Sequence, residues 1–153
     1  MIKELTFEEI QYYWKKYLWA KYTTRIHKID IHTQKNYFYR FIKYLTRDQI
    51  DEWFKATYIG YVIDDKIVGV ESGYKSNKDY YRIRGLWVND DYRGQGIATK
   101  LLKYLEIRSS EKYLWTCPRE SALGFYLKYG FKVTGLSETT LYGQNYFAVK
   151  EIE

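Results

Sequence analysis

Two glycines, Gly94 and Gly96, stand between a strand-like segment and a helix-like segment, and this junction constrains the fold most. Glycine weakens the start of a helix, so we expect the absence of side chains to make room there for the close approach of another group. The first backbone N–H groups of a helix have no intrahelical partner, and the helix dipole adds about half a positive charge. An anion is the expected guest, and a pyrophosphate fits best.

Other interpretations of the glycine pair remain open at this point. Gly94 to Thr99 is a weak match to a dinucleotide-binding G-x-G-x-x-G, which requires a tight turn directly after a parallel strand. Here the loop Asn89–Arg93 intervenes, and the strands before it form hairpins. A Walker phosphate loop is excluded because no Gly-Lys-Ser/Thr follows. A glycine-rich turn without any ligand is the simplest alternative.

The N-terminal third gives one clear element and several ambiguous ones. Thr6 and Glu9 have the spacing of a capping box, which predicts a helix from about Phe7 to Lys21. Residues 22–36 are ambiguous, with a short strand as one interpretation of 27–32. A second helix is expected in 37–45, in 47–56, or in both.

From Tyr58 the apolar period changes to two, which predicts strands. A hairpin turning at Asp64–Asp65 and a third strand over 80–89 form an antiparallel meander. A helix to about Ser109, a strand over 113–117, a helix ended by Gly130 and a final antiparallel pair follow. The prediction is a single α+β domain over residues 1–153, with a mostly antiparallel sheet and helices on both faces.

Composition narrows the function classes. The single cysteine, Cys117, excludes an intrachain disulfide and a thiolate-cluster metal site, and a small buried apolar residue is its simplest role. His27 and His32 do not align on one helical face, so no metal is expected. The net charge of +6 is spread along the chain, which makes nucleic acid an unlikely partner. The charged N-terminus and the lack of an apolar run of about 20 residues predict a cytoplasmic protein without membrane contact.

Two motifs resemble one known family. Arg93-x-x-Gly96-x-Ala98 resembles the acetyl-CoA signature of the GNAT family of N-acetyltransferases, and Glu120–Phe131 resembles a second family block. The resemblance covers about Tyr58 to Val149 and implies the GNAT fold, in which the central sheet splays open. The segment Trp115–Arg119 is also similar to a phrase in uncharacterised phage and marine bacterial members.

The resemblance implies acetyl-CoA as co-substrate, with its pantetheine arm paired to the backbone of the strand before the glycine loop. Arg119 stands near the position where many relatives carry asparagine. The residues implied to bind acetyl-CoA are Leu86, Trp87, Val88, Arg93, Gly94, Gln95, Gly96, Ile97, Ala98, Thr99 and Arg119.

The resemblance also suggests a chemistry of direct acetyl transfer to an amine. Tyr126 matches the family's general acid, although one more packed core ring is the alternative. Glu71 is the nearest central carboxylate and the candidate general base, and its alternative is an ion pair with Arg82 or Arg84 across the sheet. A bulge in this strand would send the two arginines to opposite faces.

Arg82 occupies a position where relatives often carry a carboxylate. It is therefore the candidate contact for the acceptor, which we expect to be a small primary amine with an anionic or aromatic group. The alternative function is a degenerate domain that binds CoA as a sensor or interaction module. A homodimer is compatible with the sequence.

Overall fold

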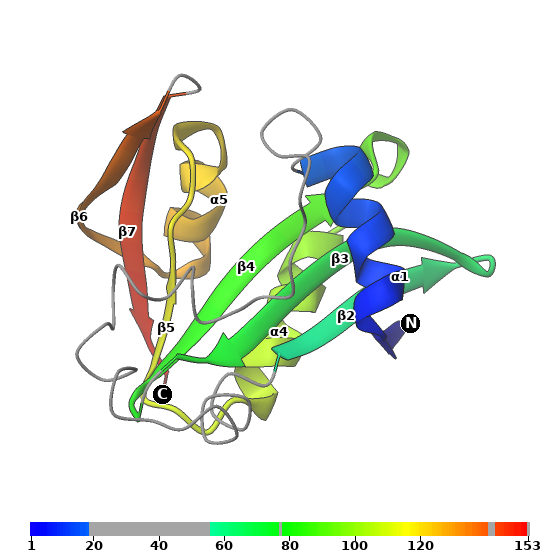
Figure 1. The fold of residues 1–153 in the computed structure, drawn as a ribbon, viewed down its shortest axis with the longest axis horizontal. Helices are drawn as coiled ribbons and strands as arrows, with labels where there is room; N and C mark the ends of the chain where they lie inside the picture. Colours follow the sequence, from blue (N-terminus) through cyan, green and yellow to red (C-terminus); the bar gives the residue numbers. More distant parts are fainter. Residues whose placement is uncertain (19–55, 77, 141–142, 153) are drawn as a thin grey trace.

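A seven-stranded sheet in the order β1-β2-β3-β4-β5-β7-β6 forms the centre of the protein (Figure 1). The computed structural model describes residues 1–18, 56–76, 78–140 and 143–152. The elements predicted over 22–55 lie outside these ranges. The strands are β1 (Ile2–Leu5), β2 (Ala56–Ile63), β3 (Lys66–Lys75), β4 (Tyr80–Val88), β5 (Tyr113–Thr116), β6 (Lys132–Thr140) and β7 (Gly143–Glu151). The helices are α1 (Phe7–Tyr13), α4 (Ile97–Arg108) and α5 (Glu120–Tyr129), with a π-helical turn over Trp14–Leu18 and a 3-10 turn over Asp90–Tyr92.

The predicted capping box at the start of α1 is confirmed. The Glu9 backbone N–H donates to the Thr6 hydroxyl, and the Thr6 N–H donates to the Glu9 carboxylate, each over 3.1 Å. These bonds pair two of the N–H groups that a helix start leaves open. The helical path continues as a π-helix to Leu18, where the described segment ends, so the predicted end at Lys21 is untested. The short strand β1, which pairs with β2, was not predicted.

The predicted antiparallel meander is also confirmed. β2 and β3 join through Asp64 and Asp65, whose φ values of 50° and 61° are those of a tight hairpin turn. β4 then pairs antiparallel with β3. This gives the mixed, mostly antiparallel sheet that the alternating apolar pattern predicted.

The sheet splays between β4 and β5, its only parallel pair among the described strands. These strands pair over three positions, from Tyr80 opposite Tyr113 to Arg82 opposite Trp115. Beyond Arg82, β4 continues to Val88 without a partner in β5, and the two strands diverge (Figure 1). The implied V-shaped opening is therefore confirmed.

Helices cover both faces of the sheet (Figure 1). α1 and the π-helical turn that follows it bury Ile10 and Trp14 against Val70 and Tyr74 on one face. α4 and α5 share the core on the other face, which includes Leu101 and Tyr126. None of the helices in the described ranges combines the length and the apolar character needed to span a bilayer.

Candidate functional site

The glycine loop leads directly into α4 and leaves open space in front of the helix. Gly94 and Gly96 have φ values of +77° and +75°, a backbone region that favours glycine, and Gly96 is the N-cap of α4. A Cβ atom built on either glycine would meet no atom within 4 Å. The backbone conformation therefore explains the glycines, and nothing in the described protein fills the space at the start of the helix.

The other loop residues differ in what they offer. Gln95 and Thr99 are exposed and Ala98 is half-buried, whereas the Ile97 side chain is 3% exposed and packs in the core. Ile97 can thus present only its backbone to a ligand. Arg93 is exposed, forms an ion pair of 3.0 Å with Asp90, and directs its Nε at the Val88 carbonyl over 3.4 Å.

A β-bulge in β4 decides which side chains face which helix. Val70 pairs with Trp87, but Ser72 pairs with Arg84, so β4 has one extra residue in between. Gly85 lies there with a φ of +83°, as expected for a bulge glycine. As a result Leu86 and Val88 pack in the α4 core, whereas Trp87 packs with the α1 cluster.

The bulge follows both arginines instead of separating them. Arg82 lies opposite Tyr74, and Arg84 lies opposite Ser72, in regular register. Residues two apart on a regular strand point to the same side. The suggestion that a bulge sends Arg82 and Arg84 to opposite faces is therefore wrong.

Glu71 is fully buried in β3 with no ordinary partner. Its exposed fraction is 0%, and neither carboxylate oxygen accepts a hydrogen bond of normal geometry from the described residues. Burial raises the pKa of the Glu71 carboxyl well above its usual range, and the nearby Ser72 backbone N–H lowers it only in part. An ion pair between Glu71 and Arg82 or Arg84 is accordingly absent from the described structure.

Tyr126 lies in the core between α5 and the sheet. It is 4% exposed and makes edge-to-face contacts with the rings of Phe125 and Phe131, at 5.1 and 5.3 Å between centroids. Burial and then the charge of Glu71 raise the pKa of its phenol well above 10, whereas a hydrogen bond with Thr116 lowers it. The phenol therefore keeps its proton at neutral pH. The sequence does not indicate this contact of Thr116, because nothing in its local pattern links it to Tyr126.

Arg82 is buried beside the end of β5. It is 8% exposed, its guanidinium lies 4.1 Å above the Trp115 ring, and its Nη1 donates to the Cys117 Sγ over 3.4 Å. Cys117 is thus half-buried and polar in its contacts, which corrects the prediction of a buried apolar residue. Arg119 is the N-cap of α5 and forms an isolated bridge with Asn145 of β7.

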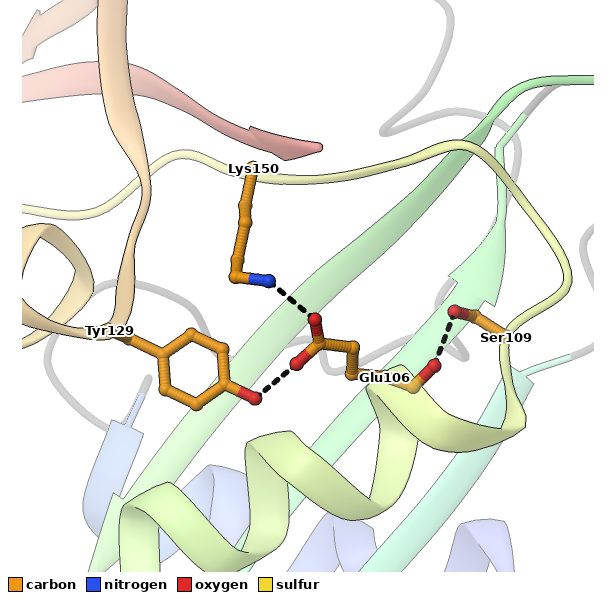
Figure 2. A network of polar contacts seen from close by, with 4 residues as sticks. All are labelled: Glu106, Ser109, Tyr129 and Lys150. Carbon is orange, nitrogen blue, oxygen red and sulfur yellow. Dashed lines mark hydrogen bonds and ion pairs between the residues drawn. The ribbon is translucent and has the colours of Figure 1, made fainter. Parts of the chain in front are cut away.

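A polar network holds α4 to the other half of the splayed sheet (Figure 2). The Glu106 carboxylate of α4 accepts hydrogen bonds from Lys150 of β7 and from the Tyr129 hydroxyl of α5. Ser109 closes the end of α4 by donating to the Glu106 carbonyl over 2.9 Å. The helix with the glycine loop and the helix with Tyr126 are therefore fixed relative to each other.

These features define what the site can bind. The open start of α4 offers N–H groups and a partial positive charge to an anion, and the part of β4 beyond Arg82 offers backbone groups to an extended molecule. A fully buried carboxyl and a protonated phenol lie on the same side of the sheet. Within the described ranges no three His, Cys, Asp or Glu side chains converge as metal ligands.

Comparisons with known proteins agree with this arrangement. The sequence model described as an acetyltransferase (GNAT) domain matches residues 55–133, just over half of the chain. A GNAT-family acetyltransferase from Staphylococcus aureus Mu50 superposes with a TM-score of 0.68 at 16% identity, covering 100% of this chain and 99% of that one. An aminoglycoside 6'-N-acetyltransferase complexed with coenzyme A gives a TM-score of 0.66 at 13% identity, with 100% and 97% coverage.

A third similar structure is a GNAT-family acetyltransferase from Elizabethkingia anophelis with acetyl-CoA bound, with a TM-score of 0.61, 17% identity, and 99% and 97% coverage. At these identities the structural likenesses show the fold. A comparison with curated protein sequences finds no match. The domain match over half of the sequence, together with the splayed sheet, shows that the chain belongs to the GNAT family of acetyltransferases.

Proposed function

We propose that the protein transfers an acetyl group from acetyl-CoA to a primary amine by direct attack within a ternary complex. The observation that carries the proposal is the open, glycine-capped start of α4 beside the edge of β4 that no strand of the described ranges pairs beyond Arg82. An anionic pyrophosphate with an extended amide-containing arm matches those two features together. Two similar structures contain coenzyme A or acetyl-CoA, as their descriptions state.

The glycine loop holds the pyrophosphate through backbone N–H groups. Gly94 and Gly96 can donate N–H groups into open space, Ala98 adds the N–H group of the first turn, and Arg93 and Thr99 add exposed donors beside them. Leu86 and Val88 direct their side chains into the core, which leaves the backbone edge of β4 to pair with the pantetheine amides. Gln95, Trp87, Ile97 and Arg119 complete the proposed binding surface.

Acetyl-CoA supplies a thioester carbonyl, and the protein must handle one proton on each side of the reaction. An alkylamine has a pKa near ~10.4 in water, so most of it carries an extra proton at neutral pH. Glu71, which is buried on the α4 side of the sheet, removes that proton through a chain of water, because burial gives its carboxylate a higher proton affinity than an exposed glutamate. Backbone N–H groups of β4 stabilise the developing oxyanion, at about 3 kcal/mol per donor.

Tyr126 donates the proton that the leaving thiolate needs. Its phenol is protonated at neutral pH, and the Thr116 hydroxyl holds it in place. The carboxyl of Glu71 raises the pKa of Tyr126, so the two groups are close enough to influence each other. The base and the acid thus act from the same side of the sheet, Glu71 from β3 and Tyr126 from α5.

Arg82 provides a cationic group near the acceptor. It lies on the opposite side of the sheet from Glu71, stacked on Trp115, and the net charge of the chain is +6. The cation of Arg82 and the positive net charge both favour a small amine with an anionic or aromatic group over a polyamine or a lysine-rich peptide.

A second candidate is a GNAT domain that binds CoA without turnover. The packing of Tyr126 between Phe125 and Phe131 favours it, because a purely structural tyrosine would pack in the same way. In that case acetyl-CoA would bind and no amine would be acetylated.

One experiment separates these functions. Free-thiol release from acetyl-CoA is measured with an amino acid, an aromatic amine, spermidine and a basic peptide, and acetyl-CoA binding is measured by calorimetry. Amine-dependent thiol release supports the transferase. Binding without release with any amine supports the non-catalytic domain, and absence of acetyl-CoA binding contradicts both.

A further inference from the structure

Three aromatic rings form a nearly parallel group on the α1 face of the sheet, which we call the aromatic ledge: Tyr13, Tyr17 and Trp87. Tyr17 stacks on Trp87 with ring centroids 4.0 Å apart and planes 13° apart. Tyr13 lies 5.5 Å from Trp87 and 6.3 Å from Tyr17, with planes tilted by 31° and 21°. The ledge joins the helical N-terminal segment to the end of β4.

Tyr17 gives the ledge an exposed side, whereas Tyr13 and Trp87 are half-buried and pack against the core. Tyr17 is 41% exposed, whereas Trp14 in the same helical turn is 1% exposed and anchors the helix to the sheet. The attachment of the helix therefore depends on Trp14 and Ile10, and Tyr17 adds little to the core. Tyr17 also lies in the π-helical turn. Such turns are rare in proteins, and those that occur are often found at functional sites.

The position of Trp87 connects the ledge to the reaction site. Leu86 and Val88 direct their side chains into the α4 core, and between them Trp87 directs its ring to the α1 face. Under the proposed function the backbone of these three residues holds the pantetheine arm. A group lying on the Trp87 and Tyr17 rings would therefore reach the thioester from the face opposite to α4.

Charges around the ledge limit what it can hold. The Lys16 ammonium lies 5.3 Å from the Tyr17 ring centroid and donates to the Tyr12 hydroxyl over 3.2 Å. A cation thus already lies over the Tyr17 ring, which disfavours a second cation placed directly on the rings. A flat neutral or anionic ring remains the best match, because offset stacking needs only π faces.

We propose that the aromatic ledge is the acceptor subsite and that it selects a primary amine with a planar aromatic ring on a short chain. The inference rests on the proposed acetyl transfer and names the acceptor class for that same site. Stacking of one additional ring corresponds to a preference of roughly 3- to 10-fold over a saturated ring of similar size.

The test compares 2-phenylethylamine with 2-cyclohexylethylamine, which share the amine, the chain length and a six-membered ring. Binding of each is measured by calorimetry in the presence of coenzyme A, where no transfer occurs, and kcat/KM of each is measured with acetyl-CoA. The variants are Tyr17→Leu and Trp87→Leu. The matched control is Tyr113→Leu, which removes one ring of the Tyr80–Tyr113 stack at the other end of β4.

The wild type and Tyr113→Leu should prefer the aromatic amine in binding and in kcat/KM. Tyr17→Leu should reduce that preference to near unity while its affinity for coenzyme A stays at the wild-type value. Trp87→Leu should also reduce the ring preference, but Trp87 belongs to the proposed acetyl-CoA-binding surface, so its affinity for coenzyme A is not used as a control. Where that variant does not fold or loses coenzyme A, the exposed Tyr17 position decides. No ring preference in the wild type, or a preference that survives Tyr17→Leu, overturns the proposal.

Failure of this inference differs from failure of the proposed function. Acetylation of amines without a ring preference leaves the transferase in place and removes the ledge as its acceptor subsite. Ring-selective binding without thiol release keeps the ledge as a binding surface and removes the transferase.

Discussion

The Lys150 ammonium on β7 lies 2.5 Å from the Glu106 carboxylate on α4 (Figure 2). Glu106 is 8% exposed, and the Tyr129 hydroxyl of α5 donates to its second oxygen. The contact spans the two halves of the splayed sheet, because β7 pairs with β5 whereas α4 packs on β2, β3 and β4. Lys150 lies opposite Leu114, which is itself opposite Tyr81, so this ion pair holds the two halves together from the helix side at the end where β4 and β5 are still paired.

Removing this ion pair should destabilise the fold. We expect Lys150→Met to lower the free energy of unfolding by about 1.5–3 kcal/mol, because Glu106 would keep its charge in a buried place with one partner fewer. Urea denaturation measures the change. Lys3→Met is the matched control, since Lys3 is half-exposed in its 3.7 Å pair with Glu9 and should have little effect. Equal losses in the two variants would contradict a special role for the Glu106 network.

The same network predicts an acid-dependent loss of stability. Burial disfavours the charged form of Glu106, but hydrogen bonds from Lys150 and Tyr129 and the charges of Lys150 and Lys103 together hold its pKa below 4.5. A carboxyl whose pKa is lowered by folding stabilises the fold at pH values above its pKa in the unfolded chain. That contribution is lost as the pH falls through its pKa in the folded protein. In Glu106→Gln the slope of unfolding free energy against pH below 4.5 should be shallower than in the wild type. An unchanged slope would show that other carboxyls dominate.

A negative charge at the start of α4 should block acetyl-CoA without harming the fold. Thr99 is exposed in the first turn, where a glutamate favours the helix dipole and competes for the same N–H groups. We expect Thr99→Glu to keep or slightly raise the melting temperature and to lower acetyl-CoA affinity at least about 10-fold, measured by calorimetry. Thr134→Glu, on the exposed β6, is the control with the same charge change. Wild-type affinity in Thr99→Glu would refute the assignment of the glycine loop.

The hydroxyl of Tyr126 should matter for turnover more than for folding. Tyr126→Phe retains the ring that packs on Phe125 and Phe131, and we expect kcat to fall about 10²-fold or more with acetyl-CoA affinity nearly unchanged. Tyr129→Phe on the same helix removes the bond to Glu106, so it should lower stability and leave kcat near wild type. Steady-state kinetics and thermal unfolding of both variants measure the contrast. Similar kcat values in the two would assign Tyr126 to packing alone.

The local part of the fold followed from the sequence. The hairpin at Asp64–Asp65, the start of α4 at Gly96 and the end of α5 at Gly130 depend on turn and cap residues, which act over a few positions. The four-residue strand β1 escaped detection because so short an alternation does not stand out from a charged terminus. The splay between β4 and β5 came from the family resemblance, and no pattern of periodicity indicates it.

The side-chain environments depend on contacts between distant residues, which a single sequence does not reveal. Lys150 and Glu106 lie 44 positions apart in the chain. The local sequence pattern around each of them predicts an exposed charged side chain. The ion pair with Glu71 that the sequence left open for Arg82 does not form within the described residues, and the Arg82 guanidinium lies on the Trp115 ring. The bulge at Gly85 determines that Trp87 faces α1, and it depends on the register with β3, which local pattern does not fix.

Glu71 gives the sharpest test, because its roles in stability and in catalysis predict opposite signs. Burial raises the pKa of its carboxyl, so the folded protein favours the protonated form more than the unfolded chain does. Stability from this group is complete below pH 4.5 and is lost as the pH rises through the folded pKa. We expect Glu71→Gln, which cannot ionise, to be more stable than the wild type at high pH and to lose less stability between acid and neutral pH.

The catalytic expectation for the same variant is a loss of kcat of about 10²-fold or more, together with loss of the low-pH limb in the rate profile. Urea denaturation across the pH range and kcat/KM profiles with one amine measure the two effects. Glu120→Gln, at the exposed first turn of α5, is the control and should change neither. If Glu71→Gln is more stable but keeps the full rate profile, the proton of the amine goes to water or to the substrate, and Glu71 is a buried acid without a catalytic role. A variant with neither effect would contradict the raised pKa as well.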